Sequence, residues 1–368
     1  MKIALVVPGG VDRSGTERVI PVLLWLIERL VRGGDEVHVF ALDQEREPGD
    51  WELLGAKVHN AGRRPRRLRS LRSLMREHRR RPFDVVHAFW AGSPGQVARA
   101  FSAAARVPLV VTLPGGDLAA LPDIGYGAQL RLRSRVATRV VLSGASAILA
   151  PSDWLAAQAA EQGWKTIRCP FGVAFDRWPP SAPRRRPPNA PMRMIHAATL
   201  NRVKDPFGLL DAMRLLADGG VDFTLDVIGE DTLGGAVQRH CHALGLDERV
   251  TFRGFVANEK LRTHFGDADL LVMSSRHEGA PIVLLEAAAA GVPTVGTEVG
   301  YIADWTPHAS VAVPLGDPEA LASEIAALAV NEEERLRLAR AAHARALAHT
   351  ADDYAAQVRT IYADVAAR

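Results

Sequence analysis

The chain of 368 residues is 48% hydrophobic and 24% charged, a balance that is typical of a folded globular protein and excludes a disordered or fibrous one. Its length exceeds what one ordinary core accommodates and predicts two domains of comparable size. No apolar run approaches the roughly 20 residues that span a bilayer, so we expect a cytoplasmic protein, with peripheral attachment to the inner face of the membrane left open. The two cysteines, Cys169 and Cys241, lack metal-like spacing and are predicted to be buried, reduced thiols.

The first half of the sequence alternates strand-like apolar runs with helical patterns. The run at 2–7 soon gives way to glycines and charges, which predicts a first β-strand rather than a signal peptide. An amphipathic pattern over 16–34 predicts a helix. Further strands are predicted at 36–42, 84–90, 108–113 and 147–152. This alternation indicates βαβ units on a parallel sheet.

A basic segment, Arg63–Arg81, contains Leu68, Leu71, Leu74 and Met75 at spacings of three and four residues. The pattern predicts a helix with a narrow apolar stripe and a strongly basic remainder. Two interpretations stay open: a solvated outer helix whose leucines pack on the sheet, or a basic face that binds anionic lipid headgroups. Nucleic acid is not an expected partner, because stacking aromatics and a recognisable binding motif are missing around the arginines.

A proline- and arginine-rich stretch at 179–191 interrupts the alternation and predicts a linker. The alternation then restarts, and the last ~50 residues read as alanine-rich helix. The strands predicted after the linker lie at 192–199, 223–229, 249–255, 269–275, 294–297 and 310–315. We therefore predict an α/β fold of two Rossmann-like, doubly wound parallel-sheet domains, 1–178 and 192–345. Such sheets bind ligands at the carboxyl ends of their strands.

Two carboxylates, Glu278 and Glu286, flank a Gly-Ala-Pro turn that leads into an apolar helix. The start of a helix offers unpaired N–H groups and a positive dipole end, which together favour a phosphate group. Gly279 lets the backbone approach a ligand closely, and Pro281 fits the first helical turn. The amides predicted to face a pyrophosphate are those of Ala280, Ile282 and Val283.

The two carboxylates would repel a phosphate, so we predict that they accept hydrogen bonds from the hydroxyl groups of a ribose or hexose. A cation is then needed to offset the diphosphate charge. Lys204, with Arg202 beside it, lies in a loop between a predicted strand and a predicted helix. Taken alone, Lys204 is equally consistent with a solvated loop lysine and with a phosphate-binding lysine. The glutamates in the same domain favour the phosphate-binding role.

The stretch Arg276–Gly300 is similar to the E-x7-E region of the retaining GT-B glycosyltransferases of family 4. The resemblance extends over nearly the whole chain, because further motifs follow in the family's order. These motifs lie at 6–20, 84–90, 108–118, 150–155, 170–178, 201–213, 250–256 and 314–322. Each motif is weak alone, and the ordered set is specific.

The resemblance implies a GT-B fold and a transfer of sugar from a nucleotide-diphosphate sugar to an acceptor hydroxyl, with retained anomeric configuration and without metal or cofactor. It implies that Lys204 holds the donor diphosphate, that Glu286 binds the ribose, and that Glu278 binds the donor sugar near the reacting carbon. A lysine and oriented amides would stabilise the leaving diphosphate. The other donor-site residues that it implies are Gly10, Gly15, Thr199, Asn201, Arg202, Phe255, Val256, Gly279, Ala280, Pro281, Ile282 and Val283. The C-terminal helix, 346–368, is expected to pack back on the first domain.

Some positions depart from the family pattern. They are Pro114 and Phe89 where histidines are frequent, Thr199 where arginine is common, and Asp304 where glutamate is usual. Asp117, in the same turn as Pro114, is predicted to take over a polar role at the catalytic centre. His87 and His196 lie on apolar strands and are interpreted as core histidines.

Competing interpretations remain open at this point. A nucleotide-sugar epimerase shares the fold, and the missing histidines leave room for a non-catalytic sugar-nucleotide-binding protein. A dinucleotide-dependent oxidoreductase fits poorly, since residues 8–15 do not form its G-x-G-x-x-G turn. Asp267 and Asp269 mimic a metal-binding D-x-D motif but are interpreted as capping or surface residues. The acceptor is unidentified and is a glycan, a lipid-linked molecule or a small aglycone.

Overall fold

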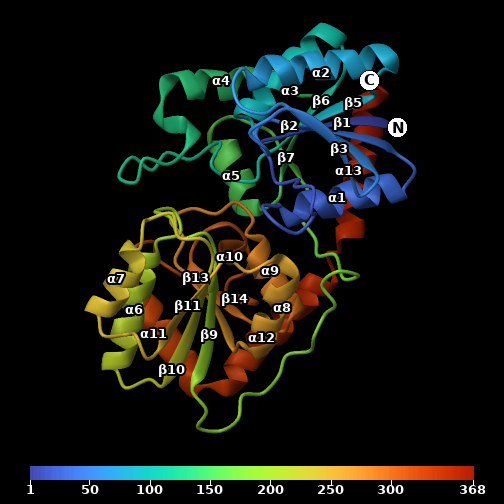
Figure 1. The fold of residues 1–368 in the computed structure, drawn as a ribbon. Helices are drawn as coiled ribbons and strands as arrows, with labels where there is room; N and C mark the ends of the chain where they lie inside the picture. The colour runs from blue at the N-terminus through green and yellow to red at the C-terminus, as the bar shows by residue number, and fades with distance from the viewer. The chain divides into compact units, whose positions relative to one another are not determined.

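The chain folds into two units, which a computed structural model describes for residues 1–368 apart from the side chain of residue 259. The first unit consists of Met1–Gly172 together with Ala351–Arg368, and the second consists of Val173–Thr350. Each unit contains one sheet with helices on both faces (Figure 1). The predicted α/β class with two parallel-sheet, Rossmann-like units is confirmed.

The first unit is built on a sheet of eight strands in the order β3-β4-β2-β1-β5-β6-β7-β8. The strands are β1 (Lys2–Val7), β2 (Glu36–Ala41), β3 (Gly49–Leu53), β4 (Ala56–Asn60), β5 (Val85–Phe89), β6 (Leu109–Thr112), β7 (Ala147–Ala150) and β8 (Ile167–Arg168). All neighbours pair in parallel except β3 and β4, which form an antiparallel hairpin at the sheet edge. The sequence did not predict β3, β4 or β8. The hairpin turns at Leu54 and Gly55, both of which have positive φ, as a two-residue type I′ turn requires.

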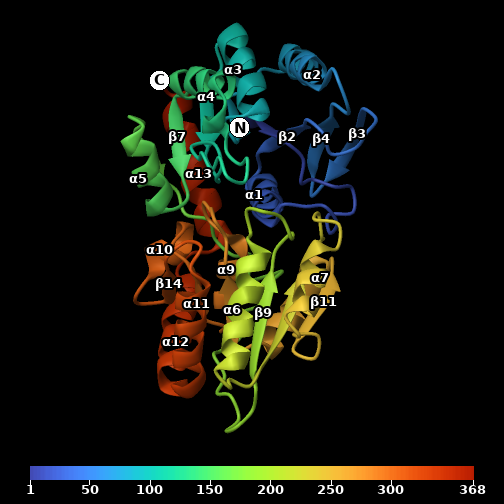
Figure 2. The ribbon, with the colours of Figure 1, turned by 90° about the vertical axis from the view of Figure 1, so that its left-hand side faces the viewer.

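Helices cover both faces of this sheet (Figure 2). They are α1 (Pro21–Arg32), α2 (Arg66–Arg80), α3 (Ser93–Ala105), the 3-10 helix η1 (Ala128–Leu130), α4 (Leu132–Ser143), α5 (Asp153–Glu161) and α13 (Ala351–Ala366). Alternate strand residues such as Ala4 and Val6 face Leu74 of α2 and Phe101 of α3 in one buried cluster. Helices α1 and α13 pack on each other and on the opposite face. The period-2 alternation of the strands thus buries both faces of the sheet.

Helix α1 begins at Pro21, so the prediction of helix from residue 16 is wrong for the first five residues. Proline lacks the N–H that a helix interior needs, and it disfavours a helical conformation in the preceding residue. Ile20 is accordingly extended, and Arg18 has a φ of 46°. Residues 8–20 therefore form a long loop after β1.

The basic segment forms the predicted helix, α2. Leu74 is fully buried, and Leu71 and Met75 pack against the same core. Leu68 is 56% exposed, so the predicted apolar stripe is incomplete at its first position.

The second unit contains a six-stranded parallel sheet in the order β11-β10-β9-β12-β13-β14. The strands are β9 (Met192–Ala197), β10 (Phe223–Ile228), β11 (Val250–Gly254), β12 (Leu270–Met273), β13 (Thr294–Thr297) and β14 (Ser310–Val313). All six lie where the sequence predicted them. The helices are α6 (Pro206–Asp218), α7 (Ala236–Ala243), α8 (Asn258–Asp267), α9 (Ile282–Ala289), α10 (Gly300–Trp305), α11 (Pro318–Val330) and α12 (Glu332–Leu347). Helices α6, α7 and α11 share one buried cluster with the sheet, and α8 and α9 lie on its other side (Figure 1).

The segment 179–191 has no regular secondary structure, but its polar groups bond to the second unit. Arg184 donates to the carbonyl oxygens of Gly266 and Asp267 at 3.1 and 2.6 Å. The Ser181 amide donates to the Ala289 carbonyl at 2.8 Å. The proline-rich stretch is therefore held by hydrogen bonds against the helices of the second unit.

Both cysteines are buried and free, as predicted. Among the residues that the structure describes, none of the helices has the length and apolar character that crossing a bilayer requires.

Candidate functional site

The carboxyl edge of the second sheet gathers the loops that carry the predicted donor-site residues. Strands β9 and β12 are parallel neighbours, so the loops that follow them meet. The Ser274 hydroxyl donates to the Lys204 carbonyl at 2.8 Å, and the Arg276 amide donates to the Val203 carbonyl at 2.7 Å. These bonds fix the lysine loop against the loop that leads into α9.

Lys204 and Glu278 are brought together as an ion pair at this edge. Glu278 also accepts a hydrogen bond from the Ser275 hydroxyl at 2.8 Å. The Asn201 side chain shapes the lysine loop, because its Oδ1 accepts the amides of Val203 and Lys204 at 3.0 and 3.1 Å. Both charged groups stay partly exposed and are accessible to a ligand.

Helix α9 begins at Ile282, directly after the Gly-Ala-Pro turn. Pro281 is its N-cap rather than a member of its first turn, with an extended backbone and no side-chain cap bond, so that detail of the sequence interpretation is wrong by one residue. The missing cap leaves the amides of Ile282 and Val283 without a side-chain acceptor. The turn is tightly packed: a Cβ at Gly300, whose φ is 53°, would lie 2.8 Å from the Gly279 carbonyl oxygen. Only glycine fits there.

Glu286 lies inside the unit, one turn along α9. Its carboxylate accepts a hydrogen bond from Asn258 at 2.7 Å, and its carbonyl accepts the Trp178 indole N–H at 3.0 Å. Burial raises the pKa of Glu286 to about 7. Asn258 was not predicted from the sequence, where its one signal is its position just after the loop that contains Phe255.

The remaining donor-site candidates lie in loops at the same edge. Thr199 and Arg202 are exposed in the loop after β9. Phe255 is 59% exposed and Val256 is half-buried after β11, which β10 separates from β9. The structure therefore places these residues two strands away from the lysine loop.

The two strand histidines are buried, which confirms their interpretation as core residues. His87 bonds through both ring nitrogens, to the Tyr362 hydroxyl and to Thr112, each at 2.7 Å, and Phe89 packs against its ring. Burial lowers the pKa of His87 to about 3 and that of His196 to about 4. His196 bonds through Nδ1 to the Val272 carbonyl at 2.9 Å. Both imidazoles are therefore neutral near pH 7.

In the apparent D-x-D motif, the interpretation as capping or surface residues agrees with the exposed Asp267 and is wrong for Asp269. Asp269 is buried, pairs with Arg184 at 2.9 Å and Arg193 at 3.5 Å, and accepts the Arg193 amide at 2.9 Å. Asp267 ends helix α8, and its carbonyl accepts a bond from Arg184.

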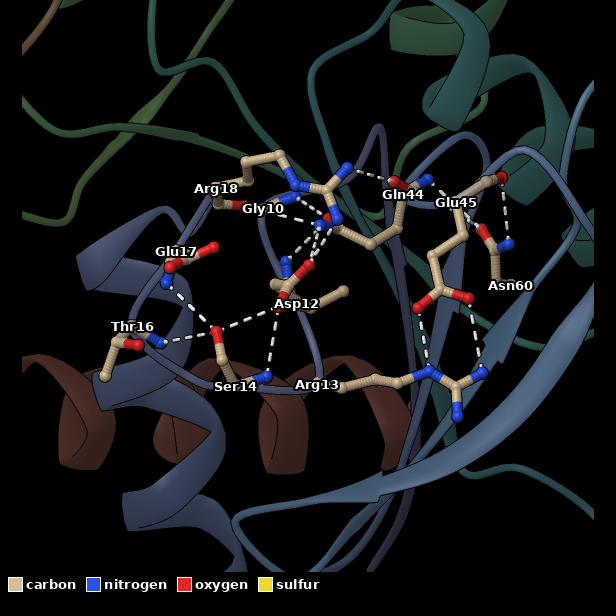
Figure 3. Close-up of polar contacts among 11 residues, drawn as sticks. Gly10, Asp12, Arg13, Ser14, Thr16, Glu17, Arg18, Gln44, Glu45 and Asn60 are labelled. Atoms are coloured by element: carbon tan, nitrogen blue, oxygen red, sulfur yellow. Dashed lines mark hydrogen bonds and ion pairs between the residues drawn. The ribbon is translucent and has the colours of Figure 1, made fainter. Parts of the chain in front are cut away.

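In the first unit, Gln44 holds the glycine-rich loop after β1 (Figure 3). Its Oε1 accepts the amides of Gly10 and Val11 at 2.6 and 3.0 Å. Asn60 in turn accepts the Gln44 amide at 3.1 Å. Gly10 has a φ of 83°, and a Cβ there would lie 2.5 Å from the Ile20 side chain. The Gly10 amide is thus already bonded, and Gln44 is a second residue whose role was not predicted from the sequence.

Asp12 ties together the rest of this loop (Figure 3). It accepts the amide and hydroxyl of Ser14 at 3.0 and 2.8 Å and pairs with Arg18 at 2.6 Å. The Gly15 amide donates to the Asp12 carbonyl at 3.0 Å. The loop has a defined conformation because its polar groups satisfy one another.

A cavity of about 520 Å³ opens at the carboxyl edge of the first sheet. Asp117 lines it, and one of its carboxylate oxygens accepts the Ala91 amide at 2.9 Å. The other oxygen has no hydrogen-bond partner among the described residues. Burial raises the pKa of Asp117 to about 7. The other lining residues are Pro8, Leu42, Asp43, Arg66, Trp90, Gly92, Ser93, Pro94, Gly115, Gly116, Tyr126, Gly127 and Ala128.

Two family models match the chain, one in each unit. Residues 19–171 match the glycosyl transferase 4-like domain, and residues 183–345 match the glycosyl transferases group 1. A relative in Bacillus subtilis, TuaC, whose name assigns it to teichuronic acid biosynthesis as a glycosyltransferase, is 26% identical over 251 residues. That match covers 66% of this chain and 60% of the relative's length.

Solved structures share the fold over the whole chain. Sucrose-phosphate synthase from Thermosynechococcus elongatus superimposes with a TM-score of 0.85 at 18% identity and covers 100% of this chain and 99% of its own. HepE from Anabaena, solved in complex with UDP and glucose, gives a TM-score of 0.76 at 18% identity and covers 99% of this chain and 100% of its own. Both structural neighbours have the GT-B fold. Since the two family models together span most of both units and the fold agrees, the chain belongs to the group 1 glycosyltransferases of the GT-B fold.

Proposed function

We propose that this protein transfers a sugar from a nucleotide-diphosphate sugar to an acceptor hydroxyl, with retention of anomeric configuration and without a metal ion. One observation carries the proposal: Lys204 and Glu278 pair beside the uncapped start of α9, at the carboxyl edge of a parallel sheet. This is the edge where open α/β sheets bind nucleotides.

The charges of this site suit a sugar diphosphate. Negative charge gathers on the diphosphate as the glycosidic bond breaks, and a cation with oriented amides stabilises it. Lys204 supplies the cation, and the amides of Ile282 and Val283 face no side-chain cap. On donor binding, the diphosphate replaces Glu278 as the partner of Lys204, which frees the Glu278 carboxylate for hydroxyls of the sugar. The ion pair is thus the resting form of two ligand-binding groups.

Glu286 is proposed to bind the ribose, with Asn258 orienting its carboxylate. The solved complex of HepE with UDP and glucose makes uridine diphosphate sugars the first donors to test. We further propose that the acceptor binds in the cavity of the first unit, where the free oxygen of Asp117 accepts its hydroxyl.

Calorimetric titration with uridine, guanosine and adenosine diphosphate sugars tests the donor site. We expect one nucleotide class to bind, and we expect Lys204→Ala to weaken that binding by about tenfold or more, because a hydrogen bond to a charged group contributes roughly 1.5–3 kcal/mol. Lys260→Ala is the matched control, since Lys260 is an exposed lysine on α8 of the same unit. Equal affinities of the two variants would refute the site.

Product analysis tests the reaction itself. Proton NMR of the transferred or hydrolysed sugar is expected to show the donor's anomeric configuration, with a rate that excess chelator leaves unchanged. Free donor with one inverted ring carbon would instead identify an epimerase. Binding without slow release of sugar would identify a non-catalytic binding protein.

A further inference from the structure

Helix α4 of the first unit exposes an apolar stripe. Leu132, Val136 and Val140 are 72%, 54% and 55% exposed and follow one another at intervals of four residues, one above the next on the helix surface. The opposite side of the helix, including Val141 and Leu142, is buried in the core. The stripe is therefore a fixed feature of a packed helix, since the buried side holds the exposed side outward.

Arginines border this stripe on both sides. At 100° per residue, Arg133 lies on one side of it, and Arg135 and Arg139 lie on the other. The sequence contains four arginines and no acidic residue between Asp123 and Asp153. None of these four arginines forms an ion pair or a side-chain hydrogen bond with any residue that the structure describes. Their positive charge is available to an external partner.

The basic segment of α2 differs in both respects. Several of its arginines have acidic partners within the unit, and these ion pairs are Arg66–Asp43, Arg76–Glu77, Arg80–Glu77 and Arg81–Glu36. Leu68 is its one strongly exposed large apolar residue among those described. The surface with free charge and apolar side chains together is thus α4 rather than the segment that the sequence pointed to.

A groove of about 410 Å³ runs beside the stripe. The half-buried indole of Trp164 lies at this groove together with Leu132, Val136, Arg135 and Arg139. Indoles, arginines and short apolar side chains are the combination that suits the boundary between lipid headgroups and acyl chains. The groove and the stripe form one continuous surface.

We propose that α4 docks this protein on an anionic bilayer, lying flat with Leu132, Val136 and Val140 inserted and the arginines at the lipid phosphates. Charge complementarity favours an anionic bilayer as the partner of this α4 surface, because an amphipathic helix with a basic rim binds anionic lipid surfaces. Three small apolar side chains bury little area, so binding is reversible and falls as salt screens the charges. The proposal is independent of the donor chemistry.

Vesicle flotation of the full chain tests the proposal. We expect binding to vesicles of phosphatidylcholine with phosphatidylglycerol, none to phosphatidylcholine alone, and loss of binding at high salt. The triple variant Arg133→Gln, Arg135→Gln, Arg139→Gln should bind about a hundredfold more weakly, because each arginine near an anionic surface contributes about fivefold. The variant Leu132→Ser, Val136→Ser, Val140→Ser should lose about tenfold or more. All six side chains are exposed, so both variants should keep the thermal midpoint of the parent.

The control removes three charges elsewhere. Arg63→Gln, Arg72→Gln, Arg79→Gln lowers the net charge equally on exposed positions in or beside α2, and it should change vesicle binding by less than about threefold. An equal loss in the control and the α4 arginine variant would overturn the assignment to α4. No binding to anionic vesicles would overturn membrane docking. A concentration-dependent dimer in sedimentation, abolished by the serine variant, would show instead that the stripe meets a second copy.

Discussion

The carboxyl group of Glu286 lies inside the second unit, where ionisation costs free energy. Burial raises its pKa from the ordinary 4.5 to about 7. Between these two pH values the folded protein binds a proton that the unfolded chain has lost. The free energy of unfolding therefore falls as the pH rises from 4.5 to 7, by about 3 kcal/mol for this one group.

We predict that Glu286→Gln removes this slope. The amide oxygen still accepts the hydrogen bond from Asn258, and it does not ionise. In urea unfolding, the free energy of unfolding of the variant minus that of the parent should rise by about 3 kcal/mol from pH 5 to pH 8. Glu248→Gln, at an exposed position, is the control. A difference that is the same at both pH values would contradict the prediction.

At the scale of elements, the loop after β1 depends on a side chain from the loop after β2. Gln44 accepts two amides, of Gly10 and Val11, and donates to Asp12 at 3.3 Å. A buried amide without an acceptor costs about 1–3 kcal/mol. The Gly10–Val11 part of the glycine-rich loop is thus held by one residue that lies far from it in sequence.

Gln44→Ala should accordingly lower the free energy of unfolding by about 2 kcal/mol or more. It should also speed hydrogen exchange at the Gly10 and Val11 amides, because both lose their acceptor. Arg13→Gln is the matched control: it breaks an exposed ion pair with Glu45 in the same network, which should cost less than about 1 kcal/mol. Unchanged exchange at both amides in Gln44→Ala would refute this account of the loop.

The sequence predicted the elements that carry a repeating pattern and missed those that do not. All six strands of the second sheet are apolar runs, and all six were found. The β3–β4 hairpin was missed because it mixes charged residues with a Leu-Gly turn at an exposed edge. The helix pattern before Pro21 was overextended, since amphipathic spacing alone does not weigh the backbone preference of the residue before proline.

The candidate site divides in the same way. Lys204 and Glu278 stand in motifs, and the structure pairs them. Gln44 and Asn258 are single polar residues whose roles arise only when distant loops meet at a sheet edge. No local sequence pattern predicts such a contact, because the bonded partner lies about 30 residues away in the chain. The stripe on α4 could not be assigned from the sequence, because a spacing of four residues shows that Leu132, Val136 and Val140 share one helix face but not that this face is exposed.

At the scale of the whole molecule, the last helix completes the first unit. Tyr362 of α13 bonds to the buried imidazole of His87 on β5, and Arg359 pairs with Asp35 at 3.1 Å. The side chains of Val358 and Ile361 are buried beside them. The stability of the first sheet therefore depends on residues that follow the second unit in the chain.

We predict that Tyr362→Phe lowers the free energy of unfolding by about 1–3 kcal/mol, because one nitrogen of His87 loses its partner inside the core. Thr360→Ala, at an exposed position on the same helix, should stay within about 0.5 kcal/mol of the parent. Hydrogen exchange of the backbone amides locates the effect. In Tyr362→Phe, exchange should become faster in β5 and β6 and stay unchanged in β9 and β12. Acceleration at β9 and β12 alone would contradict the prediction.

The split composition of the first unit has a consequence for biosynthesis. A ribosome releases Met1–Gly172 first, but the segment that completes their fold, Ala351–Arg368, leaves the exit tunnel only after the whole of Val173–Thr350. The second unit, Val173–Thr350, has emerged completely before residues 351–368 do. We therefore expect nascent chains stalled before residue 351 to contain a finished second unit and an unfinished first one, whose uncovered apolar face recruits chaperones until residues 351–368 have emerged.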